Sequence, residues 1–203
     1  MTLQAIGSEE ILERIDKHKP SKSLLRKIAK RAAVAAIFSN RPEITGDVGP
    51  HLLFMKRATR EGDPWSGHMC FPGGRSEQSD FNIQYTALRE TYEELGIDLN
   101  EDGEPVGRLS DVLARPIKLT KRPFVVTPFV YELHREPVWS LDPSEVDSVV
   151  WVPFNYLQDH NNRESMVWEK GSLSIELPCY RYEGYTIWGL TLGMTDEIIR
   201  IAA

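Results

Sequence analysis

The sequence predicts a single α+β domain, and its length, its composition and its pattern of short strands all support this. Its 203 residues, 41% apolar and 27% charged, suit one globular domain with a sizeable core. Short apolar runs bounded by turn residues recur along the chain, with few helical patterns between them. Mixed strands with few helices indicate an α+β fold.

Residues 1–30 are predicted to form a helical N-terminal extension of the main domain, which occupies residues 31–203. Ser8 is a residue type that caps helices, and the pattern after it predicts a helix over 9–17. A second helical stretch is expected over 21–30, because its apolar residues fall on one side. The role of this extension is left open.

The main domain then alternates strands with occasional helices. Apolar runs and alternation predict strands over residues 32–39, 51–57, 68–71, 107–119, 124–133 and 149–152. The other expected elements are a helix over 82–95 that stops at Gly96, a helical turn from Pro153 to Gln158, a hairpin over 180–187 that turns at Glu183-Gly184, and a closing helix over 189–201.

Charge and composition exclude several classes of protein. The net charge of −6 argues against a general nucleic-acid binder, which usually has a basic surface. Residues 1–10 lack the basic start and apolar run of a signal peptide, and no apolar stretch is long enough to span a membrane. With Cys70 and Cys179 as the only cysteines, a disulfide framework is not expected. We therefore expect a cytoplasmic protein that binds neither nucleic acid nor membrane.

The helix over 82–95 carries the residues most suggestive of chemistry. At 100° per residue, Glu90, Glu93 and Glu94 share one face, and the opposite face holds Leu88, Thr91, Tyr92 and Leu95. Like charges at this spacing repel, and a divalent cation held by the carboxylates would offset the repulsion. The alternative is a solvated helix face, in which Arg89 and Glu93 form an ordinary ion pair.

The loop before this helix favours the first interpretation. Phe71-Pro72-Gly73-Gly74 ends an apolar run, and paired glycines let a backbone approach a ligand closely. With this loop the residues resemble the signature of the Nudix hydrolases, G-x5-E-x7-R-E-U-x-E-E-x-G-U, in which U is apolar. The matching residues are Gly74, Arg89, Glu90, Glu93, Glu94, Gly96 and Ile97.

The match departs from that signature at two places. Asp80 stands where the family has its first glutamate, and eight residues rather than seven separate it from Arg89. Thr91 occupies an apolar position. Apart from Thr91, the second half of the signature, from Arg89 to Ile97, is intact. The departures therefore bear on the role of Asp80 rather than on the resemblance.

The resemblance implies an α/β/α sandwich around a mixed sheet, and it covers roughly residues 31–201. It also implies hydrolysis of the pyrophosphate bond of a nucleoside diphosphate derivative with Mg²⁺ or Mn²⁺. Glu90, Glu94 and the Gly74 carbonyl would then ligate the metal, and Glu93 would ligate it or hold a water. Arg89 would orient the carboxylates, and Asp80 would act through water or through Arg89.

Other candidate site residues lie outside the signature. The family often places a general base there, and Glu145 is the candidate; the alternative is a turn carboxylate or a helix cap. A basic loop could contact phosphates or be merely solvated, and it contains Arg115, Lys118, Lys121 and Arg122. Trp65, Trp139 and Trp168 could stack on a base or serve as packing residues.

The segment before the helix resembles the coenzyme A diphosphatase branch, whose motif reads L-L-T-x-R-[SA]-x3-R-x3-G-x3-F-P-G-G. Arg57, Ala58, Gly67 and the Phe-Pro-Gly-Gly loop fit if one residue is inserted. Met55 replaces the threonine, and Arg60 is a displaced counterpart of the second arginine. The segment from Tyr182 to Thr191 is also similar to this branch.

The expected substrate is therefore coenzyme A or an acyl-CoA, cleaved to 3′,5′-ADP and (acyl-)phosphopantetheine. The candidate substrate-binding residues are Arg57, Arg60 and Arg75. ADP-ribose, a dinucleoside polyphosphate or a nucleotide sugar is the alternative substrate, and a non-catalytic nucleotide-binding module is the alternative function. The sequence leaves the oligomeric state open, with a homodimer as the candidate assembly.

Overall fold

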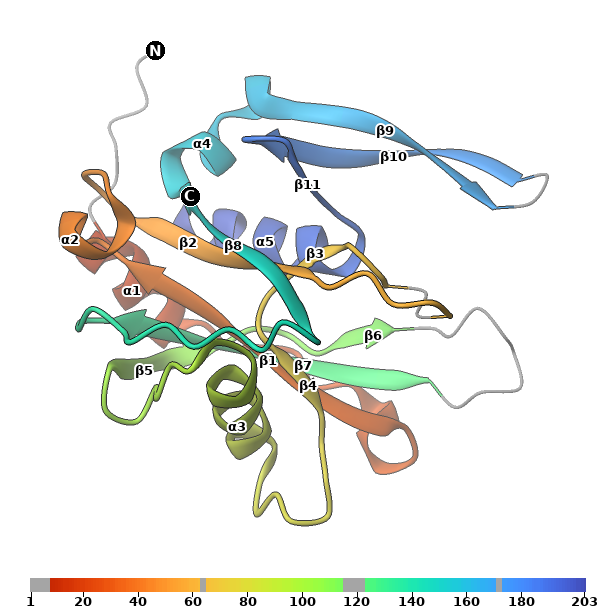
Figure 1. Ribbon diagram of the computed structural model, residues 1–203, viewed down its shortest axis with the longest axis horizontal. Helices are drawn as coiled ribbons and strands as arrows, with labels where there is room; N and C mark the ends of the chain where they lie inside the picture. The colour runs from red at the N-terminus through yellow and green to blue at the C-terminus, as the bar shows by residue number, and fades with distance from the viewer. Residues whose placement is uncertain (1–7, 63–64, 115–122, 171–172) are drawn as a thin grey trace.

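The computed structural model describes residues 8–62, 65–114, 123–170 and 173–203. An eight-stranded mixed sheet forms the centre, with helices on both faces (Figure 1). Its strands are β1 (Lys30–Ser39), β2 (His51–Arg57), β3 (Met69–Cys70), β4 (Gly73–Arg75), β5 (Gly103–Arg108), β6 (Val112–Ala114), β7 (Phe124–Leu133) and β8 (Val146–Pro153). This is the α+β arrangement around a mixed sheet that the sequence predicts.

The longer helices are divided between the two faces of this sheet. Helix α3 (Ile83–Leu95) covers one face, and α1 (Ser8–Lys17) and α5 (Gly189–Ala202) cover the other. The shorter elements are the 3₁₀ helices η1 (Leu24–Lys27) and η2 (His160–Asn162), and the helices α2 (Pro42–Thr45) and α4 (Phe154–Gln158). A second, three-stranded sheet projects from the body and consists of β9 (Arg163–Lys170), β10 (Leu173–Tyr182) and β11 (Tyr185–Trp188) (Figure 1).

Strand β1 organises the central sheet. It pairs in parallel with β7 and antiparallel with both β2 and β4. Because side chains alternate along a strand, Ala33, Ala35 and Ile37 face α3 while Ala36 and Phe38 face the opposite core. The alanines explain how α3 packs close to the strand, since a larger side chain would hold the helix away from it.

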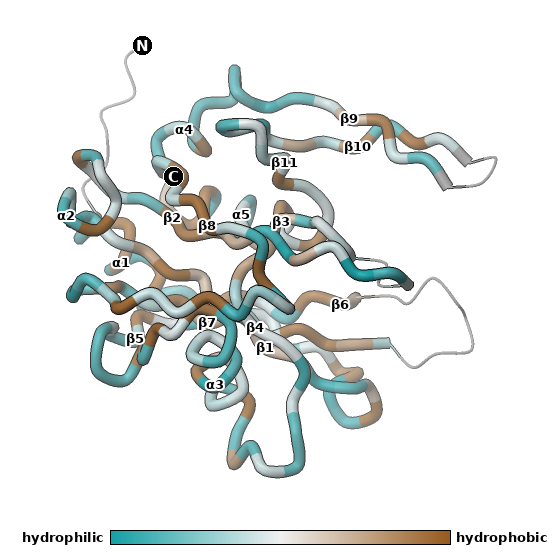
Figure 2. The backbone as a smooth tube through the Cα atoms, viewed as in Figure 1, coloured by the Kyte–Doolittle hydropathy of each residue, from teal (hydrophilic) through white to brown (hydrophobic). Residues whose placement is uncertain are grey.

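The two faces bury separate apolar clusters, which follow the brown segments of the central strands in Figure 2. On the α3 face, Leu53 and Leu95 pack around the β1 alanines. On the other face, Phe54 and Phe71 stack with their ring centroids 5.0 Å apart. Ile11 and Ile15 of α1, each 1% exposed, belong to that second cluster. The N-terminal helix is therefore part of the core, and the expected boundary at residue 30 stays a prediction.

Most expected elements are present within two or three residues of their predicted limits. The strands over 51–57 and 124–133 match β2 and β7, and the hairpin turns at Glu183-Gly184 as predicted. Glu183 at φ 47° and Gly184 at φ 83° both have left-handed backbones, which a type I′ two-residue hairpin turn requires.

Two expectations about secondary structure were wrong, and two strands were missed. The helix over 21–30 is only the short η1, because the chain is tied to Asp111 by Ser23 and must then extend into β1. The strand over 107–119 is two strands, β5 and β6, and residues 115–119 lie outside the described part. Strands β4 and β9 were not expected. They pair with β1 and β10, respectively.

In the described ranges, no helix is long and apolar enough to cross a membrane. Within those same ranges Cys70 and Cys179 are thiols rather than a disulfide.

Candidate active site

Helix α3 is capped at both ends, and the end at Gly96 is the one that the sequence predicts. The Asn82 side chain caps its start by accepting a hydrogen bond of 2.8 Å from the backbone N–H of Tyr85. Gly96 ends it with a left-handed φ of 78°, and its N–H bonds to the Tyr92 carbonyl. The orientation of the helix about its axis differs from the expectation, however. Tyr92 is 60% exposed, whereas Glu94 is 2% exposed.

Glu94 is therefore a buried carboxylate on the inner face of α3. Its Oε2 accepts a hydrogen bond of 2.7 Å from the backbone N–H of Gly73. Burial raises the pKa of Glu94 to about 8, with the neighbouring carboxylates of Glu90 and Glu145 contributing to this rise, while the Gly73 hydrogen bond and the Arg57 charge oppose it. Glu94 points into the protein, where the Gly73 N–H binds its carboxylate. The helical pattern alone would have placed it on the solvated side.

Each of the two loop positions requires a glycine, and the physical reason differs between them. Gly73 has φ 142°, and a Cβ at this position would lie 2.2 Å from the carbonyl oxygen of Ala33 on β1. A Cβ on Gly74 would lie 2.3–2.7 Å from the carboxylate atoms of Glu90. The first glycine thus permits β4 to pair with β1, and the second permits the Glu90 carboxylate to lie directly against the backbone.

Arg89 ties the first part of the signature to the helix. It donates from Nε to Asp80 at 2.9 Å and from Nη1 to Glu93 at 2.9 Å, and its Nη2 lies 3.0 Å from Glu90 Oε1. Its Nη2 also donates to the Arg75 carbonyl at 3.2 Å. The guanidinium therefore fixes two helix carboxylates and the backbone of β4 with one planar group, as an orienting residue would.

Asp80 forms a buried ion pair with Arg89. Its carboxylate is fully buried and accepts further hydrogen bonds from the Thr86 hydroxyl at 2.8 Å and the Glu77 N–H at 2.9 Å. The Arg89 hydrogen bond lowers the pKa of Asp80 to about 2, against the effect of burial. The shorter side chain thus reaches Arg89 directly, one of the two routes that the sequence left open.

The loop over 140–145 brings Glu145 to the helix from a distant part of the chain. Ser140 N–H bonds to the Leu95 carbonyl at 2.9 Å, and Asp142 N–H bonds to the Glu94 carbonyl at 3.0 Å. These bonds attach the loop to the end of α3. As a result, the Glu145 carboxylate raises the pKa of both Glu90 and Glu94.

Arg60 lies beside Glu145. It donates from Nη2 to Glu145 Oε1 at 3.2 Å and from Nε to the Ser144 carbonyl at 2.6 Å. The Ser66 hydroxyl accepts a hydrogen bond of 2.8 Å from the backbone N–H of Arg60. The pairing of Arg60 with Glu145 was not anticipated, because the two residues are 85 positions apart.

The other two candidate substrate-binding arginines occupy different surroundings. Arg57 ends β2, and its charge lowers the pKa of Glu94, so it lies within electrostatic reach of the carboxylates. Arg75 ends β4 and is exposed, with its guanidinium carbon 4.9 Å from the centroid of the Phe124 ring. The basic loop of Arg115, Lys118, Lys121 and Arg122 lies outside the described residues.

The donor set suits a hard divalent cation that is shared with a ligand. Within the described residues, no group of three His, Cys, Asp or Glu side chains is arranged to hold a metal on its own. Magnesium is usually bound by one or two carboxylates together with substrate phosphates, so a complete protein cage is not required. The Glu90 and Glu94 carboxylates beside the Gly74 backbone supply such a partial set.

The α+β sandwich, with its glycine loop and its carboxylate-bearing helix, defines a Nudix-type hydrolase domain. A NUDIX domain model matches residues 29–170, which is more than half of the chain. The protein therefore belongs to the Nudix family of pyrophosphohydrolases.

Comparisons with individual proteins agree with this assignment. The chain is 31% identical over 180 residues to a human protein named mitochondrial coenzyme A diphosphatase NUDT8, covering 87% of this chain and 72% of that protein. It is 32% identical over 128 residues to the Caenorhabditis elegans peroxisomal coenzyme A diphosphatase ndx-8, covering 62% and 50% of the two chains. A solved structure of a MutT/nudix family protein from Enterococcus faecalis shares the fold, with a TM-score of 0.52, 17% identity, and coverage of 97% of this chain and 68% of that one.

Proposed function

We propose that this Nudix pyrophosphohydrolase cleaves coenzyme A or an acyl-CoA to 3′,5′-ADP and (acyl-)phosphopantetheine. The observation that carries the chemistry is the meeting of Glu90, Glu94 and Glu145 at the Gly73-Gly74 loop. The choice of substrate is supported by the relatives named coenzyme A diphosphatases, one of which aligns with 87% of this chain.

In this proposal Mg²⁺ or Mn²⁺ is the cofactor, and when bound it would screen the phosphate charges and activate water. Glu90, Glu94 and the Gly74 carbonyl are the ligands, with Glu93 at the exposed edge of the set. Glu94 gains most from a cation, because burial and two neighbouring carboxylates disfavour its charged form. Arg89 orients Glu90 and Glu93 through its two bonds along the helix.

Glu145 is the proposed general base, and Arg60 holds it in place through the 3.2 Å ion pair. Its carboxylate is 37% exposed, so it can accept a proton from a water and release it to solvent. Glu145→Gln should lower kcat and leave KM nearly unchanged, because a neutral amide keeps the contact with Arg60 but takes up no proton. A variant with normal kcat would remove Glu145 from this role.

Arg57, Arg60 and Arg75 stay the proposed phosphate contacts of the substrate. Arg57 has the strongest support, because its charge already acts on the Glu94 carboxylate. Arg60 would have to share its guanidinium between Glu145 and a phosphate, which its five donors permit.

A substrate panel tests the proposed function. The enzyme should turn over CoA and acyl-CoA in the presence of Mg²⁺ or Mn²⁺, and the products should be identified by chromatography. Glu94→Gln serves as the matched control, because it keeps size and shape while removing one charge. Cleavage of ADP-ribose, dinucleoside polyphosphates or nucleotide sugars without cleavage of any CoA would refute the substrate and leave the family assignment intact. Binding without turnover of the whole panel would favour a non-catalytic module.

The cytoplasmic location and the homodimer stay predictions. The relatives carry names that place them in mitochondria and in peroxisomes. Fractionation of cells that produce the protein, and light scattering of the purified chain, would test the two expectations.

A further inference from the structure

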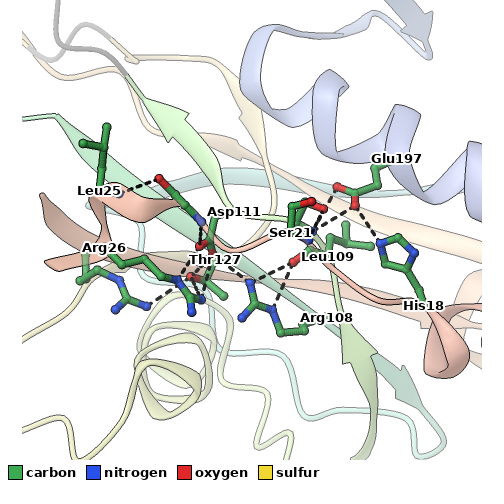
Figure 3. A network of polar contacts seen from close by, with 12 residues as sticks. His18, Ser21, Leu25, Arg26, Arg108, Leu109, Asp111, Thr127 and Glu197 are labelled. Carbon is green, nitrogen blue, oxygen red and sulfur yellow. Dashed lines mark hydrogen bonds and ion pairs between the residues drawn. The ribbon is translucent and has the colours of Figure 1, made fainter.

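Three arginines gather around a buried aspartate on the sheet face that holds the candidate active site. Asp111 lies in the segment that joins β5 to β6, and its side chain is fully buried. It accepts hydrogen bonds from Ser23 N–H at 2.8 Å, Thr127 Oγ1 at 2.9 Å, Arg108 Nη2 at 2.9 Å and Arg26 Nη2 at 3.0 Å. Figure 3 shows Arg26, Arg108 and Thr127 converging on this carboxylate. Asp111 therefore has its acceptor positions filled by these partners.

The positive charge of Arg31, the third arginine, is only weakly compensated by its neighbours. Its Nη2 donates a long hydrogen bond of 3.4 Å to Thr127 Oγ1. Its Nε is buried and has no hydrogen-bond partner among the residues that the structure describes. Burial lowers the pKa of Arg31, and the like charges of Arg26 and Arg108 lower it too, while Asp111 alone opposes them. Two cations against one anion give Arg31 a net positive environment.

This environment lies next to the catalytic loop. Arg31 precedes Ala33 by two residues on β1, and Ala33 is the direct strand partner of Gly74. Two residues along a strand span about 7 Å, and residues at this spacing point to the same face. The Arg31 carbonyl also accepts the Ser76 N–H at 3.0 Å. Arg31 is only partly buried, so part of its side chain is accessible to a ligand.

We propose that Arg31, supported by Arg26 and Arg108, binds a phosphomonoester group of the substrate. The inference rests on the proposed function, and in coenzyme A this group is the 3′-phosphate. The 3′-phosphate and the pyrophosphate are attached to the same ribose, so their binding groups must be close neighbours, as Arg31 and Gly74 are. A phosphomonoester dianion would neutralise the surplus charge and accept from the planar guanidinium fork.

A purely structural role accounts for only part of the cluster. Asp111 anchors the segment before β1 through Ser23 and Arg26, and the Asp111 N–H bonds to the Ser21 carbonyl at 3.0 Å. That anchoring does not involve Arg31. Arg31→Ala therefore tests ligand binding without disturbing the anchoring of the segment before β1. Arg31→Lys tests whether a positive charge is enough for binding without the planar guanidinium group.

The test compares CoA with dephospho-CoA, which lacks the 3′-phosphate. The wild-type enzyme should have the higher kcat/KM for CoA, and Arg31→Ala should reduce the ratio of the two values about tenfold or more. Activity on dephospho-CoA reports on folding and on the catalytic residues in the same variant. Lys27→Ala, which removes an exposed positive charge from η1, should leave the ratio unchanged. An equal loss on both substrates in Arg31→Ala would overturn the subsite.

A binding measurement supplies a second readout that needs no turnover. By calorimetry, the wild-type protein should bind 3′,5′-ADP at least about tenfold more tightly than 5′-AMP, and Arg31→Ala should lose most of this difference. Equal affinities in the wild type would overturn the subsite even if the variant failed to fold. If the enzyme cleaves CoA but shows no such preference, only this inference fails. If it cleaves other pyrophosphates and no CoA, the proposed function fails as well.

Discussion

Glu94 combines the two properties that a metal ligand on a helix needs, namely burial and a fixed direction. It is 2% exposed and is oriented by the Gly73 N–H at 2.7 Å. We expect Glu94→Gln to fold normally, because the amide oxygen can accept the same hydrogen bond. The rate should fall by more than the roughly 100-fold that loss of an outer-shell partner of a metal costs. Steady-state kinetics and thermal unfolding check the two halves of this prediction, and near-normal turnover would contradict the metal site.

The lowered pKa of Asp80 predicts a specific dependence of the free energy of unfolding on pH. Its folded pKa of about 2 lies below the ordinary value of 3.8, so it stabilises the fold above pH 3.8 and loses this effect as the pH falls through 2. The contribution at pH 5 is about 2 kcal/mol. The free energy of unfolding should therefore differ between wild type and Asp80→Asn at pH 5, and most of the difference should vanish near pH 2. A difference that stays constant over this range would contradict the buried ion pair.

The glycine loop and α3 act as one unit at the scale of secondary-structure elements. Strand β4 pairs with β1, with Arg75 opposite Ala32 and Gly73 opposite Val34. This pairing fixes the position of the loop backbone relative to the helix carboxylates. The loop over 140–145 is fixed to the opposite end of α3 by Ser140 and Asp142. The site thus depends on three segments that are aligned by backbone hydrogen bonds.

Alanine at the two loop glycines should have opposite consequences. Gly73→Ala places a Cβ 2.2 Å from a backbone oxygen and at a left-handed φ, so it should cost roughly 2–5 kcal/mol of folding free energy. Gly74→Ala meets only the end of the Glu90 side chain, which can move away. That variant should stay folded and lose activity. Denaturant unfolding and kinetics of the pair measure both effects, and an unstable Gly74→Ala with normal specific activity would reverse the assignment.

At the scale of the whole molecule, the N-terminal helix α1 contributes to the core rather than to the site. Ile15 is 1% exposed and packs in the cluster opposite α3. Ile15→Ala should cost about 2–5 kcal/mol of folding free energy by leaving a cavity. The specific activity of the folded protein at low temperature should be unchanged, because α3 lies on the other face. A loss of kcat in the folded variant would show that α1 affects the catalytic residues.

The signature on α3, the glycine loop and the Nudix assignment were predictable from the sequence, because they depend on residue types at fixed spacing along one segment. Strands such as β2 and β7 were predictable for the same reason, since their apolar runs are continuous. Helical periodicity nevertheless placed Glu94 on the solvated face, because it contains no information about a donor such as Gly73 N–H.

Contacts between distant segments required the folded chain. Three interactions join residues that are far apart in sequence: the ion pair of Arg60 with Glu145, the electrostatic effect of Arg57 on Glu94, and the contact of Arg26 with Asp111. Strands β4 and β9 likewise pair with strands that lie elsewhere in the sequence. Local spacing thus identifies the family and most of its signature residues. Burial, charge compensation and strand pairing depend on which surfaces meet, and folding alone determines that.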